Sequence, residues 1–511
     1  MSLSMSHPPG PTICVVIGRT RHKMMQIEVQ EAGKRGARMI ELRLDFLAKA
    51  PDFKRLLANK PCPVVATVRR PVDGGRWSHS EEERLMLLRQ AIVAGFDWVD
   101  LETDVIDSIP RFQDVKRIVS YHNLREVPAE LEKIHERMCG QDADILKLAV
   151  TAHQPADNIR LLELVAKATK PTIAFCMGDL GLPSRILSGQ AGSPFTYAAF
   201  NKERGIAPGL PSLDEMRKVY RYEDINVQTA IYGVIGDPVA HSLSPVIHNR
   251  AFKQLGINAV YLPFRVPRGD LAVFLKSFES LPVRGYSVTI PHKESAATVP
   301  GQKDQMVALT HAANTLLRGE NGWRSFNTDA PAAVESLRAH LPTNTEGYKA
   351  GLDTRSVLIL GAGGVARAVA HGLRREGAVL AITNRTLERA QKLAEEVGCR
   401  AIDWGARHNV LFDTLINCTS VGMYPNMDES PVHNSVLKPG ILVFETVYTP
   451  ETTLLVKEAR TRGCQVLTGV DMFVRQAAMQ FKLFTDRDPP LDFMETVVRR
   501  VLSPVALRDE T

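Results

Sequence analysis

VLILGAGGVARAVA (357–370) is the segment whose residues most closely define a fold. Its apolar beginning is typical of a buried strand, its glycines of a tight turn, and its end of the first turns of a helix. Gly361 permits the turn, Gly363 lets the backbone approach a pyrophosphate, and Ala366 lets the helix pack closely. We predict a dinucleotide-binding Rossmann-type unit, although a strand, turn and helix without a ligand would show the same pattern. The predicted cofactor-binding residues are Gly361, Ala362, Gly363, Gly364 and Ala366.

The residues after the next predicted strand indicate which dinucleotide binds. VLAIT (379–383) is followed by Asn384, Arg385 and Thr386. NAD-binding units usually carry Asp or Glu at this place, about 20 residues past the glycines, to bind the ribose 2′-hydroxyl. Arg385 instead offers a positive charge to a 2′-phosphate, so we predict NADP(H) as the cofactor.

A set of small polar residues lies upstream of the glycine turn. Ser242 and Ser244 are two positions apart in AHSLSP (240–245), and in an extended segment their hydroxyls would face one side. Hydroxyls, amides and a carboxylate are the groups that recognise a polyhydroxylated substrate. Each residue also has a structural explanation, as a helix N-cap or a solvated side chain. The other members are Thr289 and Lys293 in SVTIPHK (287–293), Asn314 in AANTL (312–316) and Asp329 in NTD (327–329).

The first 215 residues show a different regularity. Short runs rich in β-branched residues recur eight times, separated by segments with helical periodicity such as 81–93. Eight strands alternating with helices over about 220 residues is the rhythm of a (β/α)8 barrel, with an open doubly wound sheet as the alternative. The predicted strands are 13–17, 39–44, 64–68, 98–101, 117–120, 145–150, 172–176 and 195–199.

Two residues of this predicted barrel suggest chemistry on a carbonyl compound. Lys147 interrupts the apolar strand ADILKLAV (143–150). Because burial disfavours an ammonium ion and lowers its pKa, a neutral amine there would attack a ketone and form a Schiff base. His122, at the end of the preceding strand, would move protons beside it. The structural alternatives are an ion pair between Lys147 and a barrel carboxylate, and a histidine that only fills space.

Residues 12–215 resemble type I 3-dehydroquinate dehydratase. The resemblance implies that Lys147 forms an imine with the substrate ketone and that His122 removes a proton from C2 and helps water leave C1. Asp73 falls where the family usually has Glu supporting this histidine. Arg185 would bind the substrate carboxylate, and Glu41, Arg43 and Arg69 would position the ring hydroxyls. The motifs are ELRLD (41–45), TVRRPVDGG (67–75), SYHN (120–123), ADILKLAV (143–150), MGDLGLPSRI (177–186) and GSPFTYA (192–198).

One segment departs from the family pattern. The closing loop usually reads Ser-Ala-Pro-Gly-Gln, whereas this chain reads IAPGLP, with Ile206 and Leu210 in place of the hydroxyl and the amide. The loss of two polar contacts would weaken loop closure or substrate binding, unless Arg204 or Ser212 replaces them.

Residues 231–505 resemble shikimate dehydrogenase. The resemblance implies that Lys293 and Asp329 are the catalytic pair at the reacting oxygen and that Ser242 and Ser244 hold the substrate carboxylate. Thr289, Asn314 and Gln476 would hold ring hydroxyls, and Tyr448 would line the cleft. Ser287, Ala330 and Glu445 depart from the common Asn, Gly and Asp. The further motifs are NCTSVGMYP (417–425), VFETVYTPETTLL (443–455) and GVDMFVRQAAMQF (469–481).

Together the two resemblances imply consecutive reactions of the shikimate pathway. 3-Dehydroquinate would lose water to give 3-dehydroshikimate, which NADPH would reduce to shikimate, as in the fused dehydratase–dehydrogenases of plants. The predicted architecture is α/β, an N-terminal (β/α)8 barrel followed by a two-lobed dehydrogenase with a Rossmann-type NADP domain. The predicted parts are the barrel (1–220), a linker (221–228), a substrate-binding lobe (229–335), an NADP-binding lobe (336–480) and a C-terminal helix returning to the substrate lobe (481–511).

Three alternatives stay open at this point. The second half is compatible with a catabolic quinate/shikimate dehydrogenase that uses NAD, against which Arg385 argues. The first half is compatible with another Schiff-base enzyme such as an aldolase. Either fold is also compatible with a regulatory, metabolite-binding protein, against which the presence of Lys147, His122, Lys293 and Asp329 argues. For the barrel, Ile206 and Leu210 keep open a catalytically weakened, regulatory domain.

The composition excludes several other classes of protein. The chain has 511 residues, 44% of them hydrophobic and 23% charged, which suits a globular protein of several domains. Its 63 basic and 57 acidic residues are too evenly balanced to indicate a nucleic acid partner, and no run approaches the roughly 18 apolar residues of a membrane span. The seven cysteines are dispersed without a CxxC pair. We therefore expect no disulfides, no metal and, since only about a dozen residues precede the first apolar run, a cytoplasmic location.

Overall fold

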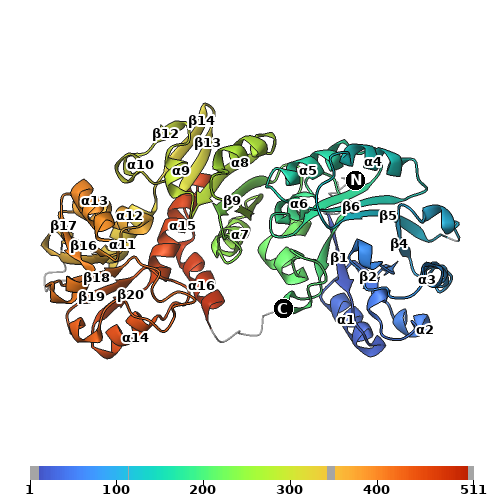
Figure 1. Cartoon of the computed structure of the whole chain (residues 1–511), viewed down its shortest axis with the longest axis horizontal. Coiled ribbons are helices and arrows are strands. Elements are labelled where there is room, and N and C mark those ends of the chain that lie inside the picture. Colours follow the sequence, from blue (N-terminus) through green and yellow to red (C-terminus); the bar gives the residue numbers. More distant parts are fainter. Residues whose placement is uncertain (1–10, 113, 342–350, 504–511) are drawn as a thin grey trace, which may run out of the picture. The chain divides into compact units, whose positions relative to one another are not determined.

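The computed structural model describes residues 11–112, 114–341 and 351–503, which form two compact units (Figure 1). The first unit contains the residues up to Ile231 together with 238–241 and 257–283. The second contains 232–237, 242–256 and the chain from Arg284 onward. None of the described helices is long and apolar enough to cross a membrane.

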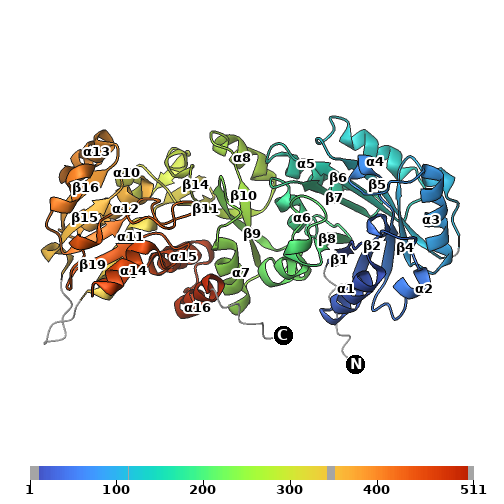
Figure 2. The same ribbon diagram turned by 60° about the horizontal axis from the view of Figure 1, so that its bottom comes forward.

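Eight parallel strands of the first unit form one nearly closed barrel (Figure 2), in the order β7-β6-β5-β4-β3-β2-β1-β8. From β1 to β7 each strand pairs with the next strand in the chain, and β8 pairs with β1. A doubly wound sheet would reverse its strand order partway, so this order confirms the barrel and excludes the open sheet. The strands are β1 (Thr12–Ile17), β2 (Met39–Arg43), β3 (Val64–Thr67), β4 (Trp98–Glu102), β5 (Lys116–Asn123), β6 (Ile145–Thr151), β7 (Thr172–Met177) and β8 (Phe195–Ala199).

The barrel strands are buried along most of their length because helices cover their outer face. The helix α3 begins with a capping box, in which the Ser80 hydroxyl accepts the Glu83 N–H at 3.2 Å and the Glu83 carboxylate accepts the Ser80 N–H at 3.0 Å. The inner face of α3 carries a fully buried arginine, Arg84. The helices are α1 (His22–Lys34), α2 (Phe53–Leu56), α3 (Glu81–Val93), α4 (Leu131–Cys139), α5 (Asp157–Lys167) and α6 (Leu182–Leu187).

A mixed six-stranded sheet follows the barrel in the chain, in the order β10-β9-β11-β13-β14-β12. β13 pairs antiparallel with both β11 and β14, while β12 pairs parallel with β14. Its strands are β9 (Ala230–Gly236), β10 (Ala259–Arg265), β11 (Val283–Val288), β12 (Gly301–Lys303), β13 (Thr315–Gly319) and β14 (Gly322–Phe326). The helices of this region are α7 (Ser244–Gln254), α8 (Leu271–Ser277), α9 (Lys293–Ala297), α10 (Gln305–Thr310) and α11 (Asp329–His340).

The last six strands form a parallel sheet in the order β17-β16-β15-β18-β19-β20, which is the Rossmann order 3-2-1-4-5-6. Along β15, Ile359 packs into the core on one face of the sheet, while Leu358 and Leu360 pack into the core on the other. The strands are β15 (Ser356–Leu360), β16 (Val379–Asn384), β17 (Arg400–Asp403), β18 (Thr414–Asn417), β19 (Leu442–Glu445) and β20 (Gln465–Leu467). The helices are α12 (Gly364–Arg375), α13 (Leu387–Val397), α14 (Leu454–Thr461), α15 (Gly469–Thr485) and α16 (Leu491–Leu502).

Candidate active sites

Lys147 lies inside the barrel, on β6, among two carboxylates and an aromatic ring. Its Nζ donates to Asp100 Oδ2 at 3.0 Å, lies 3.8 Å from Glu41 Oε2, and lies 4.3 Å from the centre of the Tyr197 ring. The residue is only 5% exposed. The ion pair raised as the structural alternative for Lys147 is therefore present. The amine is not alone with it, because Arg69 contacts the same Asp100 carboxylate and His122 interacts electrostatically with the cluster.

His122 is half-buried near the end of β5 and is suited to accept a proton. Its Nδ1 has no hydrogen-bond partner among the residues that the structure describes. Burial, together with the positive charges of Arg69 and Lys147, lowers the pKa of His122 well below its ordinary value. The imidazole is therefore neutral at physiological pH, which is the form that a general base needs.

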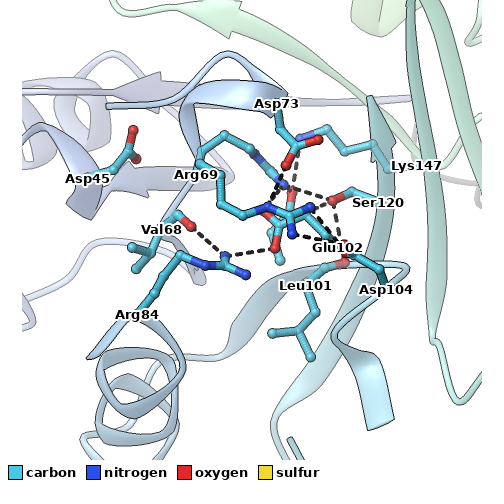
Figure 3. Close-up of polar contacts among 12 residues, drawn as sticks. Asp45, Val68, Arg69, Asp73, Arg84, Leu101, Glu102, Asp104, Ser120 and Lys147 are labelled. Carbon is cyan, nitrogen blue, oxygen red and sulfur yellow. Dashed lines mark hydrogen bonds and ion pairs between the residues drawn. The ribbon is translucent and has the colours of Figure 1, made fainter. Parts of the chain in front are cut away.

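Arg69 connects two acidic residues of β4 (Figure 3). Its Nη2 lies 2.7 Å from Asp100 Oδ2, and its Nη1 donates to Glu102 Oε1 at 2.7 Å and to Ser120 Oγ at 2.9 Å. Although burial opposes charge on both groups, each stabilises the other, so the pKa of Arg69 is raised and that of Asp100 is lowered far below its usual range. Asp100 is thus an anion shared by Arg69 and Lys147.

Arg185 on α6 has the properties of a binding site for a substrate carboxylate. The residue is 1% exposed, its guanidinium lies 4.2 Å from the centre of the Phe175 ring, and its Nε has no hydrogen-bond partner among the described residues. Burial lowers its pKa to about 10. A buried cation with an unpaired N–H group favours an anionic ligand, because such a ligand would repay the cost of its desolvation.

Two predicted site residues of the barrel have other partners. The Asp73 carboxylate accepts a hydrogen bond from Arg70 Nε at 2.8 Å. Arg43 donates to both oxygens of Asp45, at 2.9 and 2.8 Å. Neither contact joins these residues to His122 or Lys147, so their predicted roles toward the substrate stay predictions.

The loop that departs from the family pattern packs against the barrel core. Ile206 and Leu210 are partly buried against a cluster that includes Phe175 and Tyr197. The predicted substitute Ser212 is engaged elsewhere, because its hydroxyl bonds to Glu215 Oε2 at 2.9 Å. The Arg204 side chain lies outside the described part of the chain.

The second site centres on Lys293 and Asp329, which begin α9 and α11. Lys293 Nζ donates to Asp329 Oδ2 at 2.6 Å, and Asn314 Nδ2 donates to Asp329 Oδ1 at 2.9 Å. A Cβ atom added to Gly364 would lie 3.8 Å from Lys293 Cδ. The structure therefore brings together the predicted catalytic pair, a predicted hydroxyl ligand and the predicted cofactor turn.

Sequence reasoning missed Gln480 of α15, which holds Asn314 in place. Gln480 is 1% exposed, and its amide donates to Asn314 O at 2.9 Å and to Thr315 Oγ1 at 3.0 Å. Ser287, one of the departures from the family pattern, donates to Gln480 Oε1 at 2.7 Å. One signal was available, since Gln480 follows the predicted Gln476 by one helical turn.

The expected extended geometry at Ser242 and Ser244 is wrong. Leu243 has helical backbone angles (φ −82°, ψ −7°), and Ser244 already begins α7. Ser242 Oγ therefore accepts the Ser244 N–H at 3.3 Å, as in a turn closed by a serine side chain. The alternation of side chains that holds in a strand does not hold where the chain turns into a helix.

The other residues predicted to contact the substrate are Thr289, Gln476 and Tyr448. Thr289 follows β11, where its N–H donates to Ile235 O at 2.9 Å. The Gln476 amide donates to Phe473 O at 2.9 Å, and the Tyr448 ring stacks on Phe473 with centres 4.8 Å apart. Burial raises the pKa of Tyr448, so its hydroxyl stays protonated at physiological pH.

The glycine turn fits a dinucleotide. Gly361 has φ +108°, and an added Cβ would lie 2.9 Å from Cys418 O, so only glycine suits this position. A Cβ on Gly363 would meet nothing within 4 Å, which leaves open space at the N-terminus of α12 for a phosphate. Arg385 is exposed beyond β16, while Asn384 Nδ2 donates to Thr386 O at 3.0 Å. The open helix amides suit a pyrophosphate, and the exposed arginine suits a ribose 2′-phosphate.

Glu445 is a buried carboxylate beside the cofactor side of the Rossmann sheet. It accepts hydrogen bonds from Asn417 Nδ2 at 2.9 and 3.1 Å, from Val447 N at 3.0 Å and from Thr453 Oγ1 at 2.9 Å. Burial outweighs these bonds and raises the pKa of Glu445 to about 7. The ends of β18 and β19 and the start of α14 therefore meet at one titratable group.

Asp100 and Tyr197 are the residues of the barrel site that sequence reasoning missed. Asp100 contacts Lys147 directly, and the Tyr197 hydroxyl is buried without a hydrogen-bond partner among the described residues. A signal existed for Asp100, since it lies two positions before Glu102 on β4 and both side chains therefore face the same side of the strand.

Four protein-family models match parts of the chain. Their descriptions are type I 3-dehydroquinase (residues 13–227), shikimate dehydrogenase substrate binding domain (234–316), shikimate/quinate 5-dehydrogenase (345–420) and shikimate 5′-dehydrogenase C-terminal domain (469–499).

Similar proteins cover both halves of the chain. A bifunctional 3-dehydroquinate dehydratase/shikimate dehydrogenase of Arabidopsis thaliana, a chloroplastic protein, is 36% identical over 94% of this chain and 82% of its own. A shikimate dehydrogenase (NADP+) of Shouchella clausii is 37% identical over 54% of this chain and all of its own. A crystal structure of a shikimate dehydrogenase in complex with NADP+ is 31% identical, with a TM-score of 0.50 over 55% of this chain and 98% of its own.

Proposed function

This chain belongs to the family of bifunctional 3-dehydroquinate dehydratase/shikimate dehydrogenases, and from that premise we propose that it converts 3-dehydroquinate to 3-dehydroshikimate and then to shikimate. The barrel would dehydrate the first compound, and the second unit would reduce the product with NADPH. The observation that carries the proposal is the juxtaposition of the Lys147 amine with carboxylates and a neutral histidine inside the barrel.

Dehydration would proceed through a Schiff base on Lys147. The neutral amine attacks the C3 ketone and water leaves, which forms the imine. With its nitrogen protonated, the imine is an iminium ion. His122 takes a proton from C2, and the electrons of that C–H bond move into the iminium to give a neutral enamine. The enamine electrons return to expel the C1 hydroxyl, which leaves as water with the proton from His122. Hydrolysis of the imine then releases the enone and restores the amine.

The remaining barrel residues would bind and orient the substrate. Arg185 would hold its carboxylate, since the Nε of this buried cation has no hydrogen-bond partner in the described part of the chain. Glu41, Arg43 and Arg69 would position ring hydroxyls. Asp73 would support His122, as the resemblance implies, while its carboxylate also accepts a hydrogen bond from Arg70.

In the reductase, Lys293 and Asp329 would deliver a proton to the oxygen of the reacting carbonyl. The 2.6 Å ion pair keeps the lysine ammonium in place, and Asn314 fixes the carboxylate from the other side. Bound NADPH supplies the hydride. Ser242 and Ser244 would hold the substrate carboxylate. Thr289, Asn314 and Gln476 would hold the ring hydroxyls of the substrate, and Tyr448 would line the cleft.

The cofactor would be held by the glycine turn and the residues after β16. Its pyrophosphate oxygens would accept hydrogen bonds from the first backbone N–H groups of α12. Arg385 would bind the 2′-phosphate, with Asn384 and Thr386 nearby.

We assign residues 1–220 to the dehydratase, 221–228 to a linker, 229–335 to the substrate lobe, 336–480 to the NADP lobe and 481–511 to a C-terminal segment that returns to the substrate lobe. We also propose that the enzyme acts in the cytoplasm on these small molecules, without a nucleic acid or membrane partner.

One mixture tests both activities. The protein is given 3-dehydroquinate and NADPH, and the enone absorbance and the loss of NADPH are followed together. We expect the enone to rise and then fall as NADPH is consumed, and borohydride with 3-dehydroquinate to add the mass of one reduced adduct at Lys147. Absence of both enone and adduct would refute the dehydratase assignment. Consumption of NADH in preference to NADPH would favour the catabolic alternative.

A further inference from the structure

A chain of charged side chains leads from Lys147 through the barrel wall to the helix α3 (Figure 3). Lys147 Nζ and Arg69 Nη2 share Asp100 Oδ2, at 3.0 and 2.7 Å. Arg69 Nη1 donates to Glu102 Oε1, and the other oxygen of Glu102 accepts from Arg84 Nη1 at 2.8 Å. Positive and negative groups alternate along the whole chain.

Arg84 is fully buried and binds the surroundings of Arg69 at two points. Its Nη1 donates both to Glu102 Oε2 and to the backbone carbonyl of Val68, each at 2.8 Å. Val68 precedes Arg69 in the chain, and Glu102 is the side-chain partner of Arg69. Arg84 therefore fixes both the backbone before Arg69 and the carboxylate that holds the Arg69 guanidinium.

The other two nitrogen atoms of the Arg84 guanidinium are also paired. Its Nε and Nη2 donate to the two oxygens of Glu81, at 2.9 and 2.7 Å, in the bidentate geometry that only a guanidinium provides. A lysine at this position would keep the charge but, as a single point donor, would not bind Glu81, Val68 and Glu102 together.

We propose that Arg84 is a positioning residue for the dehydration step, which holds Arg69 against Asp100 so that Asp100 is not left to pair with Lys147 alone. This inference rests on the proposed Schiff-base function of Lys147. Without Arg84, the uncompensated Glu102 draws Arg69 toward itself, and Asp100 keeps the lysine as an ammonium ion that does not attack a ketone.

The charge of Arg84 also acts on the lysine through the alternating groups. Loss of this cation adds a net negative charge to a buried cluster, so imine formation is expected to need a higher pH. The titratable and charged groups that face Lys147 are Cys14 on β1, Glu41 on β2, Arg69 after β3, Asp100 on β4, His122 on β5 and Tyr197 on β8.

The test compares Arg84→Met and Arg84→Lys in the full-length protein, with the NADPH-dependent reduction of 3-dehydroshikimate as an internal reference. We expect each variant to lose about 100-fold in dehydratase kcat, the loss typical of a misplaced catalytic group. We measure the rate of borohydride trapping as a function of pH. In Arg84→Met the acidic limb of this curve, where the rate falls as the pH decreases, moves to higher pH. In Arg84→Lys, which keeps the charge, that limb stays where it is. Reduction of 3-dehydroshikimate is unchanged in both.

A matched control and a milder variant separate positioning from folding. Arg117 on β5 is another buried arginine of the barrel. Its guanidinium contacts Ile109 O at 2.8 Å and Asp142 Oδ2 at 3.1 Å, away from the chain of charges. Arg117→Met should keep the dehydratase kcat within a few-fold of wild type. If Arg84→Met does not fold, Glu81→Gln tests the same point, since Glu81 is partly exposed and its replacement frees one end of Arg84.

Two results would overturn the inference. One is a dehydratase kcat within twofold of wild type, with an unchanged pH dependence of borohydride trapping, in every Arg84 variant that folds. If neither Arg84 variant folds, the same result in Glu81→Gln would overturn the inference. The other is a loss in those variants that Arg117→Met reproduces, which would make Arg84 merely structural. A wild-type protein that neither dehydrates 3-dehydroquinate nor forms the adduct would refute the proposed function itself, and this inference with it.

Discussion

Replacement of Glu445 by Gln should remove one component of the pH dependence of folding. Glu445 is completely buried, and its pKa is raised from 4.5 to about 7. Because the folded protein holds this proton more tightly than the unfolded chain, stability is greatest at low pH and falls as the pH rises from 4.5 through 7. Each pKa unit is worth about 1.4 kcal/mol, so the ionised carboxylate costs the fold about 3 kcal/mol above pH 7.

The measurement is urea unfolding of wild type and Glu445→Gln at a series of pH values. Trp323 and Trp404 lie in the second unit, so a background with Trp77→Phe and Trp98→Phe restricts the fluorescence signal to it. The glutamine amide resembles the protonated carboxyl, which bonds to Val447, Thr453 and Asn417. We expect the unfolding free energy of wild type, minus that of the variant, to fall by about 2.5 kcal/mol between pH 5 and pH 8. A difference that stays constant across this range would refute the reasoning.

Three further predictions concern the two sites. Lys147→Ala should abolish borohydride-trapped adduct and dehydration while leaving reduction unchanged, whereas Lys293→Ala should slow reduction by about 10² to 10⁴-fold and leave dehydration intact, as separate assays on the same samples would show. Arg385→Asp should lower kcat/KM for NADPH by about 10 to 100-fold through loss of a charge-assisted bond, and a retained preference for NADPH over NADH would contradict that role. Ile206→Ser combined with Leu210→Gln should lower the KM for 3-dehydroquinate, and an unchanged or higher KM would show that the apolar loop does not limit binding.

The sequence was sufficient for the elements that depend on local pattern. The eight predicted barrel strands each overlap an observed strand, and 81–93 matches α3 residue for residue. The turn at Gly361 and the start of α12 were likewise predictable, because a left-handed backbone angle and an open helix N-terminus impose their own residue types. Resemblance to known motifs then led to the pairing of Lys293 with Asp329. In the structure, Lys293 Nζ lies 2.6 Å from Asp329 Oδ2.

The contacts that tune the barrel chemistry needed the tertiary structure. Asp100 meets Lys147 only because β4, β5 and β6 are neighbours with a particular register, in which Ser120 lies opposite Lys147. Arg84 meets Glu102 only because α3 packs its inner face on these strands. Ser242 and Ser244 show the converse case, where a local rule for extended chain failed because a helix begins between them.

The sequence by itself thus determined the barrel strands, the glycine turn, the order of the two folds and the residues capable of reaction, since these follow from periodicity and side-chain chemistry. Only the tertiary structure decided which buried charges neutralise one another, and therefore which groups carry protons. That outcome depends on distances of a few ångströms between segments that are far apart in the chain. Because the dielectric constant of the interior is low, the interaction energy of two charges there changes strongly with the distance between them.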